Sequence, residues 1–141
     1  MEQQPKAVEV ARKAGAGAYT EVTGISAPAS AIAGSLVQIQ ITIKNKYSSE
    51  AGIMARAVLE YGVTPWPVAD IPNYWANVPA GQSYSFVGSF TMPAYAVIIH
   101  GYSYYYGSGG TWHFDDEKTK NVSLGEQEAV FNNLSVAYRR V

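Results

Sequence analysis

The sequence predicts an all-β domain, an antiparallel sandwich of about seven to eight strands. Three observations lead to this prediction. Apolar and polar residues alternate with period two in several segments, turn residues recur roughly every eight to twelve positions, and no long segment has a strong helical period. The chain has 141 residues, of which 48% are hydrophobic and 15% are charged. That length is enough for one domain with a single hydrophobic core.

The clearest strand is expected over residues 35–45. Apolar β-branched residues alternate there with Gln, Thr and Lys, which indicates a strand with one buried face. The apolar members are Val37, Ile39, Ile41 and Ile43. A second strand is expected over residues 52–61, with Ile53, Ala55, Ala57, Leu59 and Tyr61 on one face. Residues 62–82 contain several prolines, so we expect a long connection there without a central strand.

Shorter strands are expected in the second half of the chain. Aromatic residues alternate with serines over residues 83–90, and a longer strand is expected over 95–106. The sequence Gly107-Ser108-Gly109-Gly110 predicts a hairpin that returns into residues 111–114. Residues 115–117 are all acidic, which predicts a polar corner before a last short strand over 118–124.

Three regions follow from these predictions. Residues 1–19 form an N-terminal arm, either flexible or ordered by a partner, and residues 5–14 within it have the pattern of a short helix. The sandwich spans residues 20–125. Residues 126–141 form an extra C-terminal strand that either folds back as an edge strand or adds to the sheet of a neighbouring subunit. In the second case Arg139 and Arg140 pair with acidic groups of that neighbour.

Two segments carry a resemblance to a known fold family. Residues 33–45 read AGSLVQIQITIKN, and Pro79-Ala80-Gly81-Gln82 leads into SYSFVGSF. From about Ile25 to Leu124 the chain resembles immunoglobulin-like β-sandwiches of the CARDB and related adhesion-module type. The hairpin YSYYYGSGGTWHFDDEK also resembles segments of small immunoglobulin-like virion proteins of phages and other viruses. Neither family is defined by a catalytic residue, so the resemblance implies a fold and no catalytic site.

Composition excludes several classes of protein. The formal net charge of −1 excludes a nucleic-acid binder that acts by bulk counterion release. The absence of cysteine excludes zinc fingers, iron–sulfur centres, thiol catalysis and disulfide scaffolds. No apolar run approaches the roughly 18 residues of a membrane span. We therefore expect neither nucleic acid nor a membrane among the partners, and no cofactor.

The charged residues do not form a recognisable catalytic or metal-binding motif. Asp115 and Asp116 are candidate calcium ligands, but their spacing matches no EF-hand loop, so no metal site is predicted. There is no Gly-x-Ser-x-Gly motif for a hydrolase. His100 and His113 are expected as ordinary strand and hairpin residues. We expect that the protein is not an enzyme.

Most of the aromatic residues lie between Tyr61 and Phe114, where Asp70 is the one formally charged side chain. A sandwich core does not need so many rings, so several of them are expected at the surface. Tyrosine and tryptophan are favoured at interfaces because they bury much area with few torsions. The predicted contact residues are Tyr102, Tyr104, Tyr106 and Trp112, with Arg139 and Arg140 as an ionic latch.

These expectations favour a non-enzymatic structural protein. We interpret it as a virion component, either a capsid decoration, a capsid-associated or a tail protein, that contacts copies of itself or other shell subunits. It is then assembled in the host cytoplasm, since the chain starts at Met1 without a secretory signal. Removal of an export signal would instead place it at a cell surface. The alternative function is a carbohydrate-binding or adhesion module that uses an exposed strip of Trp66, Tyr74 and Trp75.

Overall fold

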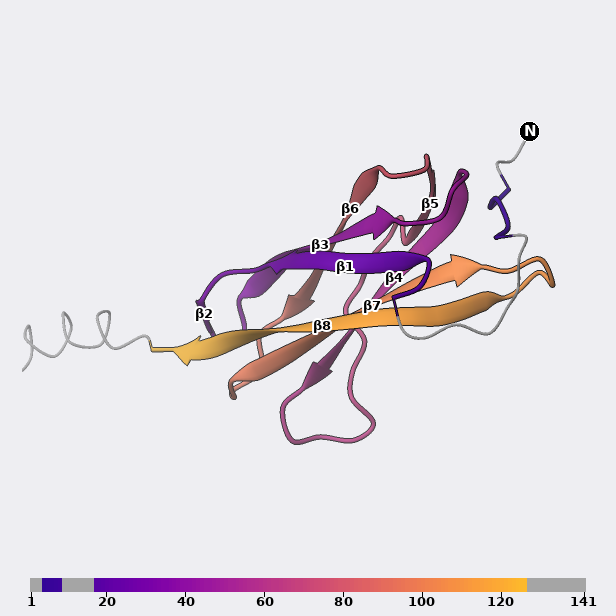
Figure 1. Cartoon of the computed structure of the whole chain (residues 1–141). Helices are drawn as coiled ribbons and strands as arrows, with labels where there is room; N and C mark the ends of the chain where they lie inside the picture. Colours follow the sequence, from indigo (N-terminus) through magenta and orange to yellow (C-terminus); the bar gives the residue numbers. More distant parts are fainter. Residues whose placement is uncertain (1–3, 9–16, 127–141) are drawn as a thin grey trace, which may run out of the picture.

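Eight strands form two sheets that pack face to face (Figure 1). The structure is a computed structural model that describes residues 4–8 and 17–126, and every regular element in these two segments is a strand. One sheet has the order β1-β3-β6, and the other has the order β2-β8-β7-β4-β5. The strands are β1 Thr20–Ser26, β2 Ser30–Ile32, β3 Leu36–Asn45, β4 Ala51–Glu60, β5 Trp75–Val78, β6 Ser83–Thr91, β7 Val97–Tyr106 and β8 Trp112–Gly125. The prediction of an all-β sandwich is confirmed.

The core lies between the two sheets and is formed by the side chains that alternate inward from each strand. β3 buries Val37, Ile39, Ile41 and Ile43, as the sequence pattern predicted. The opposing sheet contributes Ile53, Ala55, Ala57 and Leu59 from β4, and Val97, Ile99 and Val122 from β7 and β8. Because alternate side chains of each strand point into the core, the remaining side chains form one outward-facing surface on each sheet.

The acidic residues 115–117 lie inside one continuous strand, so the prediction of a polar corner there was wrong. β8 runs unbroken over 14 residues and pairs with β7. Ser103 pairs with Asp116 and Tyr104 pairs with Phe114, which leaves Asp115 as the extra residue of a β-bulge. A bulge re-aims side chains locally, and here it turns both aspartates toward β1.

The long connection between β4 and β5 is held against both sheets. The Leu59 N–H donates to the carbonyl of Pro67 at 2.9 Å, which ties the connection to β4. The backbones of Asp70 and Ser89 exchange two hydrogen bonds of 2.9 Å, which tie it to β6. A Cβ atom on Gly88 would lie 2.5 Å from the Asp70 carbonyl oxygen, so this approach requires glycine. The predicted connection, residues 62–82, includes β5, but β5 is an edge strand. The prediction that this range contains no central strand is therefore confirmed.

Residues 4–8 lie against the ends of β4, β5 and β7. The Gly52 N–H donates to the Lys6 carbonyl at 2.7 Å, and the Val8 N–H donates to the Tyr106 carbonyl at 2.8 Å. The side chain of Val8 is fully buried. The predicted helix over 5–14 is therefore wrong for residues 5–8, because the backbone groups of this segment pair with the sheet. The rest of that helix lies outside the described residues.

Candidate interaction surface

The outward face of the three-stranded sheet is mainly polar. The outward β3 side chains are Leu36, Gln38, Gln40, Thr42 and Lys44. Thr42 and Ser85 form a hydrogen bond of 2.8 Å between their hydroxyl groups on adjacent strands. Leu36 and Val87 are the apolar exceptions and are 64% and 59% exposed. This face has the composition of a solvated sheet surface.

The outward face of the five-stranded sheet is covered by rings. Tyr102 and Tyr104 of β7 point outward and make edge-to-face contacts with Phe114 of β8, at centroid distances of 5.6 and 5.9 Å. Tyr106 lies 5.1 Å from Trp112, which in turn lies 6.2 Å from Trp75 on β5. Phe114 is 52% exposed at the centre of this arrangement. We call this surface the aromatic face; its residues are Trp66, Trp75, His100, Tyr102, Tyr104, Tyr106, Trp112 and Phe114.

The predicted contact residues Tyr102, Tyr104, Tyr106 and Trp112 all belong to the aromatic face. Cross-strand register brings them together, because β7 and β8 are joined by the Gly107–Gly110 turn. Arg139 and Arg140, the predicted ionic latch, lie outside the described residues. The structure thus assembles the aromatic part of the predicted interface on one surface.

The predicted glycan strip is divided between three places. Trp66 stacks on His100, which is opposite Val58 on β4, whereas Trp75 contacts Trp112 and is opposite Met54 on the same strand. Val58 and Met54 are four residues apart, and at roughly 3.3 Å per residue the positions that hold the two tryptophans are about 13 Å apart along β4. Tyr74 instead lines a pocket at the edge of the sheet. The three rings therefore do not form one continuous strip, although both tryptophans belong to the aromatic face.

His100 is held between two carboxylates on neighbouring strands. Its Nε2 lies 2.8 Å from Glu60 Oε1 on β4, and its Nδ1 lies 2.7 Å from Glu117 Oε2 on β8. The ring of Trp66 stacks on the imidazole at 4.6 Å with an interplanar angle of 23°. Burial lowers the pKa of His100, but the hydrogen bonds and charges of Glu117 and Glu60 outweigh it, so the pKa is raised above 6.5.

This arrangement was not predicted, because it needs the register of three strands. Both imidazole nitrogens are engaged by carboxylates, which leaves neither nitrogen free to bind a metal or to act as a base in this geometry. The cluster instead supports Trp66, which comes from the long connection and stacks on the imidazole. Across residues 4–8 and 17–126, no group of three or more His, Cys, Asp or Glu side chains is arranged to hold a metal ion.

Asp115 and Asp116, the calcium candidates, accept hydrogen bonds from the backbone of β1 and its approach. Asp115 is 4% exposed, and its Oδ2 accepts from the N–H and hydroxyl of Thr20 at 2.6 and 2.7 Å. The N–H groups of Ala18 and Tyr19 donate to the same carboxylate at 3.2 and 3.1 Å. Asp116 accepts one bond of 2.9 Å from the Val22 N–H. The two side chains join the edges of the two sheets.

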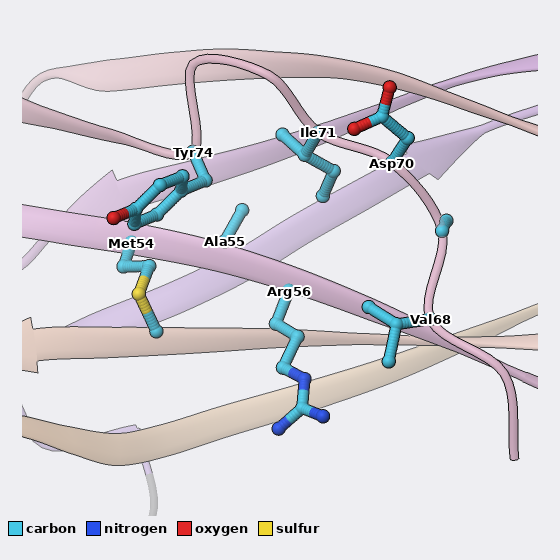
Figure 2. Close-up of a pocket in the computed structure, with 8 residues that line it drawn as sticks. Met54, Ala55, Arg56, Val68, Asp70, Ile71 and Tyr74 are labelled. Atoms are coloured by element: carbon cyan, nitrogen blue, oxygen red, sulfur yellow. The ribbon is translucent and has the colours of Figure 1, made fainter.

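A pocket of about 290 Å³ adjoins the aromatic face at the edge of β4 (Figure 2). Its lining is mostly apolar, with Val68 54% exposed and Tyr74 48% exposed. Two charged side chains belong to its lining, and Figure 2 shows Arg56 and Asp70 pointing away from each other, with Val68 beside Arg56. The remaining lining residues are Met54, Ala55, Ala69 and Ile71.

Comparison with known proteins identifies the fold only. No family model and no curated protein matches the chain. The CARDB domain of a Pyrococcus furiosus protein, determined in complex with di-metal ions, is similar with a TM-score of 0.54 and 12% identity, over 76% of this chain and 86% of that chain. The alkylpurine DNA glycosylase AlkC of Pseudomonas fluorescens is similar with a TM-score of 0.56 and 10% identity, over 77% and 31%.

A β-glucuronidase of Bacteroides uniformis is also similar, with a TM-score of 0.51 and 11% identity, over 75% of this chain and 14% of that chain. This chain therefore corresponds to a small part of both enzymes. The likeness to the CARDB domain confirms an immunoglobulin-like β-sandwich. In the described segments, no helix has the length and apolar character needed to cross a membrane.

Proposed function

We propose that this protein is a non-enzymatic structural protein that binds neighbouring subunits through its aromatic face. The observation that carries the proposal is the contrast between the two outward surfaces of the sandwich. One sheet presents mainly glutamine, serine and threonine, with Leu36 and Val87 as separate apolar residues, whereas the other presents a cluster of rings in contact with one another, with Phe114 52% exposed among them. An apolar patch of this kind on one face of a domain marks a contact surface.

The geometry of the rings suits protein contact. Tyrosine and tryptophan bury large areas on binding with little loss of torsional freedom, and their polar groups can be satisfied at the rim. The rings contact one another edge to face across β7 and β8, and the stack on His100 supports Trp66. Because the surface is already ordered in the single subunit, little further entropy is lost when a partner binds.

We place this assembly in a virus particle, where the protein contributes a decoration, capsid-associated or tail subunit. The support is the low charge, the abundance of aromatic residues and the resemblance of the β7–β8 hairpin to virion proteins. The mechanism is passive: burial of the aromatic face between subunits stabilises the particle by mass action. Detection of the protein in purified particles by mass spectrometry tests this location, and its absence from them would contradict it.

Subunit contact is tested by measuring the molar mass of the full chain by size-exclusion chromatography with light scattering. Phe114→Glu places a charge at the centre of the aromatic face, and we expect it to abolish the oligomer. Val87→Glu is the matched control, since Val87 is similarly exposed, at 59%, on the polar sheet. A chain that is monomeric at every concentration, or that responds equally to both substitutions, would contradict the proposal.

A second candidate function is binding of a surface glycan by the same face. It is favoured by the flat stacking of Trp66 on His100, since a supported indole is a platform for a sugar ring. A glycan array probed with the wild-type chain and with Trp66→Ala tests this function. Binding that is lost in Trp66→Ala would support it, and an array without signal would contradict it.

A further inference from the structure

His100 lies between two carboxylates in a geometry that only the protonated imidazole satisfies. Its Nε2 lies 2.8 Å from Glu60 Oε1, and its Nδ1 lies 2.7 Å from Glu117 Oε2. Both are hydrogen-bond distances, and an ionised carboxylate can only accept hydrogen bonds. A neutral imidazole has one N–H and one lone pair, so it can donate to one carboxylate and is repelled by the other. The distances therefore match an imidazolium that donates to both neighbouring strands at once.

The charged and titratable side chains that face His100 come from three strands. The register places them within two residues of the positions opposite His100, or two residues from it along β7; they are Arg56, Glu60, Glu117 and Tyr102. Burial and the charge of Glu117 raise the pKa of Tyr102, so its hydroxyl stays protonated where histidine titrates. Lys118 and Lys120 alternate to the opposite face of β8. The long connection contributes an uncharged indole. His100 is therefore the group whose charge changes near neutral pH.

His100 also joins Trp66 to the other rings of the aromatic face. The indole lies 4.6 Å from the imidazole, the imidazole lies 6.4 Å from the ring of Tyr102, and Tyr102 contacts Phe114 at 5.6 Å. Residues 62–65, which precede Trp66 in the connection, are exposed. A cation beside the face of an indole is attracted to its π electrons, so the imidazolium holds Trp66 more strongly than a neutral imidazole would.

We propose that His100 is a positioning residue for Trp66 and that its protonated form completes the aromatic face, so that binding of a neighbouring subunit is linked to protonation of His100. Loss of the proton sets a lone pair against one carboxylate and removes the positive charge beside the indole. Trp66 then leaves its place, and the face loses the ring at this end. The inference rests on the proposed function and deepens it, because it names the condition under which the face binds. Since linkage is reciprocal, binding of a neighbour also favours the protonated form.

Nuclear magnetic resonance tests the control of Trp66 within the subunit. The chain contains two histidines and three tryptophans, so H113Q and W66F assign the signals of His100 and Trp66. Nuclear Overhauser contacts between the imidazole and indole protons report the stack, and they are followed in the full chain from about pH 5.5 to about pH 8.5. We expect these contacts to be strong at the acidic end and to be lost as the pH rises through the midpoint of His100. Glu117→Gln removes one carboxylate and should move that loss to lower pH.

Sedimentation equilibrium at the two ends of this pH range tests the link to subunit contact. Wild type should associate at least about fivefold more tightly at the acidic end, whereas H100Q should associate equally at both. H113Q is the matched control, since His113 stacks on Tyr105 and not on Trp66, and it should behave as wild type.

Each combination of results decides a different point. Loss of the Trp66–His100 contacts above the midpoint of His100, with association that weakens in parallel, supports the inference. Contacts that persist at every pH, in a chain whose oligomer is lost in Phe114→Glu, would overturn the inference and leave the proposed function standing. Association that is indifferent to pH while the contacts are lost would overturn the link between them. A chain that is monomeric at every pH and still loses the contacts would overturn the proposed function and support the control of Trp66 by His100.

Discussion

Asp115→Ala should be among the most destabilising single substitutions in this domain. Its carboxylate is 4% exposed and accepts four hydrogen bonds: from the N–H groups of Ala18, Tyr19 and Thr20, and from the Thr20 hydroxyl. Thr20 is fully buried, so its N–H loses its acceptor and gains no water when the carboxylate is removed. The substitution therefore removes the Asp115 part of the link between β1 and β8, leaves the bond from Val22 to Asp116, and leaves a buried donor unsatisfied.

The size of the effect follows from these contacts. The two bonds to Thr20 are short and buried, and a hydrogen bond to a charged group contributes about 1.5 kcal/mol or more. The bonds from Ala18 and Tyr19 are longer and partly buried, and their N–H groups can return to water. We therefore expect Asp115→Ala to lower the free energy of unfolding by about 3 kcal/mol.

The neighbouring Asp116 provides the control. It is less buried and accepts one bond, from the Val22 N–H, so Asp116→Ala should cost about 1 kcal/mol. Urea unfolding followed by tryptophan fluorescence measures both variants. With a slope of about 1.5 kcal/mol/M, the midpoint should fall by about 2 M for Asp115→Ala and by about 0.7 M for Asp116→Ala. Equal costs for the two substitutions, or a cost below about 1 kcal/mol for Asp115→Ala, would refute the reasoning.

Two further predictions concern His100 and Gly88. The pKa of His100 is raised in the folded protein, so its contribution to stability is complete below about pH 6.5 and is lost as the pH rises through the folded value. Unfolding free energies measured across this range should show that decline in wild type and a smaller decline in Glu117→Gln; identical profiles would contradict the role of Glu117. Gly88→Ala should cost about 2 kcal/mol, because the added methyl group would lie 2.5 Å from the backbone oxygen of Asp70. Gly24→Ala is the control, because no atom lies within 4 Å of its new Cβ, and it should change the free energy of unfolding by no more than about 0.5 kcal/mol. Thermal or urea unfolding measures both variants. Equal costs at the two glycines would show that the close contact with Asp70 is not the cause of the destabilisation.

The sequence alone was enough to predict the sandwich and the strands β3, β4, β6 and β7. Alternation in β3 and β4 is a local property of the chain, since successive side chains of a strand point to opposite faces. The β7–β8 hairpin was predicted for the same reason, because the glycine-rich turn and the two strands are adjacent in the sequence. The surplus of rings between Tyr61 and Phe114 likewise indicated that some of them are at the surface.

Only the tertiary structure decided which side chains meet. Glu60 and Glu117 lie 40 and 17 residues from His100 in the sequence, and no local pattern shows that three strands place them around one imidazole. Asp115 and Asp116 have the composition of a solvated corner, yet a bulge in β8 directs them to backbone donors of β1 about 95 residues earlier in the chain. Strand periodicity is determined within a few residues, whereas register, bulges and the pairing of distant strands depend on the packing of the whole domain.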